Sequence, residues 1–131
     1  MKRAELLMAL SERGYFIGQT GAEISTVFGY HLDSQIGRID EMYIHPSSET
    51  LLTGAAVLED ITRSAQMHLG QIIVAFLPED APESLFQLFR TAGYDYFEKD
   101  QLPANWQLAI DESQPEKSYF MIKILRDVSR G

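Results

Sequence analysis

The sequence predicts a mixed α/β fold, in which helices cover the faces of a sheet with both antiparallel and parallel strands. Glu23–Leu32 alternates apolar and polar residues, and a second strand-like segment, Ile36–His45, follows after a polar turn, which predicts an antiparallel hairpin. A long amphipathic helix candidate, Thr50–Leu69, then leads into Ile72–Leu77, an unbroken apolar run typical of a strand buried on both faces of a parallel sheet. We expect the 131-residue chain, 1–131, to form one domain.

The N-terminal residues favour a helix followed by a short strand. Leu6, Leu7 and Leu10 recur at helical spacing, and Gly14 can end the helix. Charged and polar residues interrupt this segment and no small-residue cleavage site follows it, so we interpret it as an amphipathic helix rather than a secretion signal. Tyr15–Ile17 then predicts a short strand.

The second strand of the hairpin changes its apolar phase. In a regular strand Ile39 would point to one face of the sheet, whereas Met42 and Ile44 would point to the other. A β-bulge near Asp40–Met42 would bring these side chains back to one face, and bulges often re-aim a side chain beside a functional site.

The two later helices have recognisable start and end signals. Thr50–Leu69 carries apolar residues every three or four positions, and Ser47 or Ser48 can cap its first turn. We expect the next helix to run from Asp80, as its cap, to Gly93, as its end.

The C-terminal third favours strands. Tyr94–Phe97 and Trp106–Ile110 are strand candidates within sequence rich in turn formers. Ser118–Leu125 predicts a last strand. The expected order is therefore helix, antiparallel hairpin, helix, buried strand, helix and C-terminal antiparallel strands.

The composition narrows the classes of partner. The chain holds 19 acidic and 11 basic residues, a net charge of −8, which argues against a nucleic acid or an anionic membrane as partner and suits a cationic one. It has no cysteine, which excludes disulfides and thiolate catalysis and fits a cytoplasmic location. No apolar run reaches the roughly 20 residues of a membrane-spanning helix. His31 and His68 have no neighbour at metal-ligand spacing, so we expect no metal site.

In order, these segments resemble the GCN5-related N-acetyltransferase (GNAT) superfamily from about Ile24 to Leu125. Met42-Tyr43-Ile44-His45-Pro46 is similar to the family's central strand with its apolar-x-x-Pro ending, and Thr50–Leu69 to the helix that follows. Leu85–Tyr94, which ends in Ala92-Gly93-Tyr94, resembles a later helix with its alanine, glycine and aromatic ending.

The resemblance implies an acyl-CoA-dependent N-acyltransferase that transfers an acetyl group from acetyl-CoA to a small-molecule or protein amine. It implies that the loop and first turn after the central strand hold the coenzyme A pyrophosphate through main-chain N–H groups. The cofactor-binding residues would then be Ile44, Leu52, Thr53, Gly54 and Ala55.

The sequence departs from the family pattern at that loop. The family has arginine or glutamine, two residues, glycine, one residue, then glycine or alanine; here Glu49 and Leu52 stand at the first two of these positions, and Gly54 keeps the last. Exchanging a cation for an anion lowers the expected coenzyme A affinity by about 100-fold. The family's proton-donating tyrosine falls at Phe89, which carries no proton to give.

Two catalytic candidates lie on or beside the central strand. Asp40 and Glu41 are adjacent, so a regular strand would direct one to each face, and Glu41 could take a proton from an amine directly or through water. His45, at the strand's end, could be a base or an acceptor-site residue. For each residue the alternative is structural: a solvated acid beside the bulge, or a hydrogen-bonded strand-end histidine.

Two hypotheses of function stay open. The first is the active N-acyltransferase. The second is a catalytically inactive GNAT-like interaction or ligand-sensing module that has lost coenzyme A binding. In either case a homodimer could cover sheet surface that the short N-terminal part leaves bare.

Overall fold

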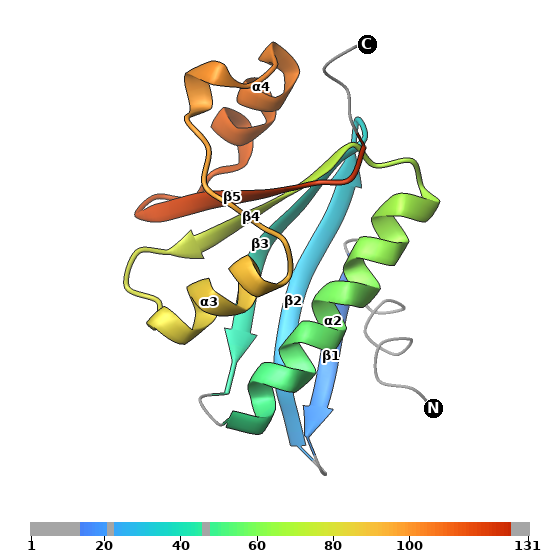
Figure 1. Ribbon diagram of the computed structural model, residues 1–131, viewed down its shortest axis with the longest axis vertical. Helices are drawn as coiled ribbons and strands as arrows, with labels where there is room; N and C mark the ends of the chain where they lie inside the picture. Colours follow the sequence, from blue (N-terminus) through green and yellow to red (C-terminus); the bar gives the residue numbers. More distant parts are fainter. Residues whose placement is uncertain (1–13, 21–22, 46–47, 127–131) are drawn as a thin grey trace.

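One five-stranded sheet forms the centre of the molecule. The structure, a computed structural model, describes residues 14–20, 23–45 and 48–126. In sheet order the strands are β1 (Gly14–Thr20), β2 (Glu23–Asp33), β3 (Ile36–Ile44), β4 (Ile72–Pro78) and β5 (Ser118–Ile124). All neighbours are antiparallel except β3 and β4, which run parallel (Figure 1). The mixed α/β prediction is confirmed.

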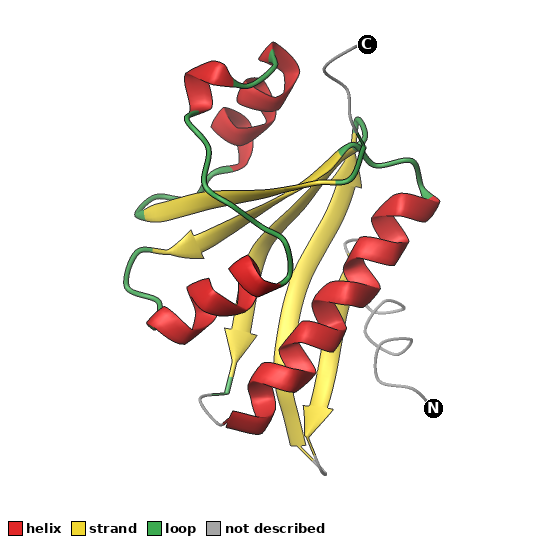
Figure 2. Ribbon diagram, in the orientation of Figure 1, coloured by secondary structure: helices red, strands yellow, loops and turns green. Residues whose placement is uncertain are grey.

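Helices cover both faces of this sheet. Helices α2 (Ser48–Met67) and α3 (Glu83–Thr91) lie on one face, and α4 (Ala104–Ser113) follows a short 3₁₀ turn, Lys99–Gln101, and packs on the other (Figure 2). Helix α2 provides the parallel crossover from β3 to β4 that the sequence predicted.

The two faces have separate apolar cores. The larger core fills the space between the sheet and α2 and α3; its buried members include Phe28, Ile39, Ile61, Leu77 and Phe89. The smaller core lies under α4. There Trp106, Ala109 and Ile110 of the helix meet buried side chains of the strands, such as Val74 and Ile122. Strand β4 supplies both cores because its residues are buried on both faces, as its unbroken apolar run predicted.

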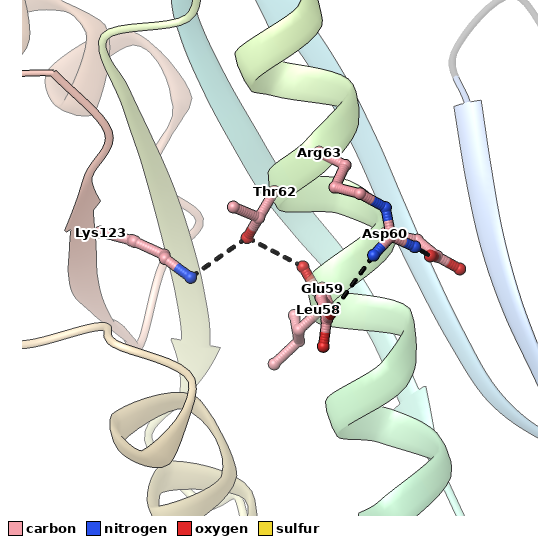
Figure 3. Close-up of polar contacts among 6 residues, drawn as sticks. All are labelled: Leu58, Glu59, Asp60, Thr62, Arg63 and Lys123. Atoms are coloured by element: carbon pink, nitrogen blue, oxygen red, sulfur yellow. Dashed lines mark hydrogen bonds and ion pairs between the residues drawn. The ribbon is translucent and has the colours of Figure 1, made fainter.

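Polar contacts lie along the outer face of α2 and connect its side to β5 (Figure 3). Arg63 forms ion pairs with Glu59 and Asp60 one turn earlier, on the exposed face of the helix. On the side toward β5, Lys123 Nζ donates to Thr62 Oγ1 over 3.3 Å, and Thr62 Oγ1 donates to the Leu58 carbonyl over 3.0 Å. Lys123 thus links the edge strand to the middle of α2.

The expected bulge is present in β3. Gly29 pairs with Glu41 and Tyr30 pairs with Ile39, which leaves Asp40 as the extra residue. Ile39 is a core residue, and Met42 packs against the same core. The bulge therefore resolves the change of apolar phase that the sequence shows.

Two strand predictions are wrong. Trp106–Ile110 lies in helix α4, because Trp106, Ala109 and Ile110 recur at helical spacing and together bury one face against the sheet. Tyr94–Phe97 contributes only one bridge, between Asp95 and Ile122.

The predicted cap of helix α3 is wrong. Helix α3 begins at Glu83, after Pro82, and no side chain caps it, so Asp80 is not its cap. Ser48 is already within α2, and Ser47 lies outside the described residues. The predicted N-terminal helix also lies outside them.

Candidate functional site

The parallel pair β3 and β4 separates halfway along its length. Pairing is limited to Ile36–Ile39 against Ile72–Ala75, and the strands then diverge toward their C-terminal ends (Figure 1). The separation starts at the bulged residue, Asp40. An opening between two strands exposes main-chain groups and side chains that a closed sheet would bury.

A cavity of about 360 Å³ lies at this opening. Strand β3 contributes Asp40, Glu41 and Met42 to its lining, and β4 contributes Phe76 and Pro78. The turn that leads into β5, residues 115–118 with Ser118 as the first residue of the strand, completes it. Asp40 and Glu41 thus line one cavity, and Asp40 is the residue that the bulge inserts into β3.

The lining is acidic. Asp40, Glu41 and Glu116 are opposed by one basic lining residue, Lys117, so the formal charge of the lining is −3 + 1 = −2. Acidic side chains around a concave surface raise the local concentration of cations. The site therefore suits a positively charged ligand.

Hydrogen bonds hold the turn that forms the far wall. Ser118 Oγ donates to the Pro115 carbonyl over 2.6 Å, and Gln114 Nε2 donates to the Ser118 carbonyl over 2.8 Å. The Glu79 N–H donates to the Lys117 carbonyl over 2.9 Å, which ties the turn to the chain after β4. Lys117 has a φ of 56°, an uncommon conformation for a residue with a side chain. Hydrogen bonds within the turn and one hydrogen bond to the chain after β4 therefore hold this wall in place.

Glu41 has a defined partner outside the cavity. The Tyr15 hydroxyl of β1 donates a hydrogen bond to Glu41 Oε1 over 2.8 Å. Sequence reasoning missed Tyr15, since only the register of three strands brings it to Glu41. It also missed the 115–118 turn, because that turn follows β3 by some 70 residues and only the fold brings the two together.

Several solved structures that share this arrangement of strands and helices are acetyltransferases. A GNAT-family acetyltransferase from Staphylococcus aureus Mu50 superposes with a TM-score of 0.66 at 15% identity, over 90% of this chain and 71% of that one. PaiA N-acetyltransferase from Thermoplasma acidophilum, solved with coenzyme A, gives 0.62 at 9% identity, over 92% and 67%. The chain has the GNAT fold.

A third structure extends the comparison. N-acetylglutamate synthase from Neisseria gonorrhoeae, solved with coenzyme A and N-acetylglutamate, gives a TM-score of 0.61 at 16% identity, over 97% of this chain and 28% of that one. No protein-family model matches the sequence, and no curated protein matches it. The likeness is thus one of fold, at low sequence identity.

In this GNAT fold, α2 begins directly after β3, where the family resemblance places the pyrophosphate. Gly54 faces inward: a Cβ atom there would lie 2.9 Å from Leu88 Cδ2 of α3 and 3.2 Å from Ile44 Cδ1 of β3. Thr53 faces Gly18 of β1. Gly54 and Ile44 therefore meet each other and α3.

The other expected coenzyme contacts have different surroundings. Ala55 is exposed on α2. Leu52 lies within the first turns of α2, and its side chain is outside the described part of the structure, as is that of Glu49. The main-chain N–H groups in the first turn of any α-helix have no carbonyl partner within the helix.

Phe89, at the position of the family's tyrosine, is fully buried. Its ring lies 5.6 Å from that of Phe28 and 5.1 Å from that of Tyr94, measured between ring centroids. A buried ring without an ionisable group cannot deliver a proton to a departing thiolate.

His45 lies beyond the end of β3. It is exposed, and its main-chain N–H donates to the Ser25 carbonyl over 2.8 Å, which continues the pairing with β2. His45 is not among the residues that line the cavity. The structure thus brings Glu41 to the cavity and leaves His45 outside it.

Two buried tyrosines lie in the larger core, away from the cavity. Burial raises the pKa of Tyr30 to about 12, and burial together with the neighbouring Tyr30 raises the pKa of Tyr94 further. Both hydroxyls lack a hydrogen-bond partner in the described structure.

The described residues form neither a metal-ligand cluster nor a membrane-spanning helix. No group of three or more His, Cys, Asp or Glu residues there could hold a metal ion. No described helix is long and apolar enough to cross a membrane.

Proposed function

We propose that this protein is an acyl-CoA-dependent N-acyltransferase that moves an acetyl group to an amine. The observation that carries the proposal is the acidic cavity at the point where β3 and β4 diverge in a GNAT fold. An acceptor amine is cationic in water, and the lining with a formal charge of −2 attracts it.

Glu41 is the proton acceptor in this proposal. The bound ammonium first releases one proton to solvent. The lone pair of the resulting neutral amine then forms a bond to the acyl carbon, the carbon–sulfur bond breaks, and the sulfur leaves with the bonding electrons. The nitrogen loses a proton, which the Glu41 carboxylate takes directly or through one water. The departing thiolate takes its proton from solvent, because Phe89 has none to give.

Some features at the start of α2 favour binding of acetyl-CoA, the acyl donor, and others oppose it. The start of α2 supplies main-chain N–H donors and a positive dipole end for a pyrophosphate. Glu49 stands in the first turn where the family has a cation, and Gly54 is packed against Leu88. We therefore expect binding that is weak and made by the main chain.

Calorimetric titration with acetyl-CoA and with coenzyme A, followed by an acetyl-transfer assay on a panel of diamines, amino acids and basic peptides, tests the proposal. We expect saturable heat with both compounds and transfer to the cationic acceptors. Absence of both heat and a thermal shift at millimolar ligand would refute it.

The second candidate is an interaction or ligand-sensing module without catalysis. The observation in its favour is the contact of Gly54 with Leu88 and Ile44, which uses for helix packing a glycine that the family uses for close approach of a phosphate. In this case a cationic ligand would bind the cavity while acetyl-CoA would not bind.

Location and assembly are part of the same proposal. We place the protein in the cytoplasm, because a cysteine-free sequence suits a reducing compartment. We also propose a homodimer, which light scattering after size-exclusion chromatography tests through the mass of the particle. A mass near 14.9 kDa would contradict the dimer.

A further inference from the structure

We infer that Tyr15 is a positioning residue that holds the Glu41 carboxylate at the cavity, and that Gly29 leaves the space through which the two side chains meet. The inference rests on the proposed use of the cavity for an amine. It adds two residues, from two other strands, to that site.

The strand register puts the three residues in one row. Tyr15 of β1 pairs with Gly29 of β2, and Gly29 pairs with Glu41 of β3. Directly paired residues of neighbouring antiparallel strands share a face of the sheet. Two strand spacings, roughly 10 Å, separate the outer members of the row. Only long side chains can meet across that distance, and the Tyr15 hydroxyl reaches Glu41 Oε1 at 2.8 Å.

Gly29 is required by space rather than by backbone conformation. Its φ lies outside the left-handed region, so its backbone is open to any residue. A Cβ atom at this position would lie 2.9 Å from Glu41 Oε1, 3.0 Å from Glu41 Cβ and 3.2 Å from Tyr15 Cε1. Any side chain in the middle of the row would displace the Glu41 carboxylate, the tyrosine ring, or both.

The bulge lies between the Tyr15–Glu41 contact and the opening that forms the cavity. The register shift lies between Gly29 and Tyr30, directly beside the row, with Asp40 as the inserted residue. Glu41 is thus the first regularly paired residue after the bulge, and it lines the cavity. An exposed carboxylate on a flexible side chain samples several rotamers, and a hydrogen bond from a rigid phenol reduces that number. Glu41 is then already oriented when a cationic ligand arrives.

A double-mutant cycle on ligand affinity tests whether Tyr15 acts through Glu41. The probe is 1,4-diaminobutane, and its dissociation constant is measured by NMR titration for the wild type, Tyr15→Phe, Glu41→Gln and the double variant. We expect Tyr15→Phe to weaken binding about 5-fold in the wild type and to have no effect once Glu41 is glutamine. Equal losses in both backgrounds would overturn the inference, because Tyr15 would then act independently of Glu41.

Two further variants sharpen the result. Tyr43→Phe removes an exposed hydroxyl from the same strand as Glu41 and is expected to leave diamine affinity unchanged. Gly29→Ala is expected to weaken binding as Tyr15→Phe does, and a wild-type affinity in folded Gly29→Ala would contradict the role given to Gly29. The Tyr15 hydrogen bond is exposed, so its removal leaves folding nearly unchanged.

The titration separates this inference from the proposed function. The diamine measurement needs no acetyl-CoA, so it reports on the row even if the acyl donor fails to bind. Where transfer is measurable, Tyr15→Phe should also lower kcat/KM for the amine and leave the KM for acetyl-CoA unchanged.

Discussion

At the scale of single residues, Glu49 is the difference from the family pattern with the largest expected effect on the affinity for acetyl-CoA. Residue 49 lies in the first turn of α2. The positive end of a helix dipole stabilises a carboxylate at such a position, and we expect a carboxylate there to repel a phosphate. The same position in the family resemblance holds a cation. We therefore expect this single residue to set the sign of the charge at the proposed pyrophosphate site.

Exchanging this charge should restore affinity. We expect Glu49→Arg to tighten acetyl-CoA binding by at least tenfold, because repulsion is replaced by a charge-assisted hydrogen bond. Calorimetry with acetyl-CoA measures the change. Glu112→Arg, the same exchange on the exposed side of α4, is the matched control and should leave affinity unaltered. Weaker binding by Glu49→Arg would show that the loop is misplaced.

The buried tyrosines give the protein a dependence on alkaline pH. The pKa of Tyr30 is raised to about 12 and that of Tyr94 further, whereas both lie near 10 in an unfolded chain. The folded state therefore holds more protons than the unfolded state above pH 10. The stabilisation is fully present below pH 10 and is lost as the pH rises through 12.

Urea unfolding at a series of pH values measures this loss. We expect the free energy of unfolding to fall by about 1.4 kcal/mol per pH unit for each tyrosine between pH 10 and 12. Tyr94→Phe should reduce the slope by half, since it leaves only Tyr30. A slope that is the same in Tyr94→Phe and the wild type would contradict the assignment.

At the scale of elements, Gly54 sets how closely α2 approaches α3 and β3. In an isolated helix, glycine to alanine stabilises by about 1 kcal/mol. Here the added methyl would lie 2.9 Å from Leu88 Cδ2, so the Leu88 side chain or the helix must move. We expect Gly54→Ala to lower the free energy of unfolding by about 1 kcal/mol in spite of the helix propensity.

A second background separates the two contributions. In Leu88→Ala the space beside Gly54 is open, so adding Gly54→Ala should now stabilise the protein by about 0.5–1 kcal/mol. Urea unfolding of the four members of this cycle checks the prediction. A destabilisation of the same size in both backgrounds would show that Leu88 is not the obstacle.

The elements also show how far the sequence alone could lead. The phase change between Ile39 and Met42 predicted the bulge, because strand alternation is strict and a break in it has few explanations. The segment around Trp106 was misread, because its apolar residues fit strand and helix spacing almost equally over so few positions. The core under α4 then decided the outcome.

The candidate site was predictable only in part. Asp40 and Glu41 could be singled out because both lie at the predicted bulge on the central strand. Tyr15, Gly29 and the 115–118 turn could not, since their positions depend on the register of β1 and β2 and on where β5 begins. Contacts between residues distant in sequence are fixed by packing rather than by local pattern.

At the scale of the whole molecule, the fold identifies the class of structure, whereas the proposed chemistry depends on the site. The GNAT fold is clear from the solved structures, although the identities are as low as 9% and 15% for two of those compared. Fold alone does not determine chemistry. The acidic cavity, its fixed far wall and the Tyr15–Glu41 hydrogen bond are features of this chain, and the proposed acceptor amine rests on them.

The place of Trp106 has an experimental consequence. It is the only tryptophan of the chain, it lies buried in the smaller core, and its Nε1 donates to Gln71 Oε1 over 3.2 Å. Intrinsic fluorescence excited at the indole band therefore reports on the α4 side of the sheet, while far-ultraviolet circular dichroism is weighted toward the 20-residue α2 on the other side. Comparing the two signals through one denaturation curve asks whether the two sides of the sheet melt together.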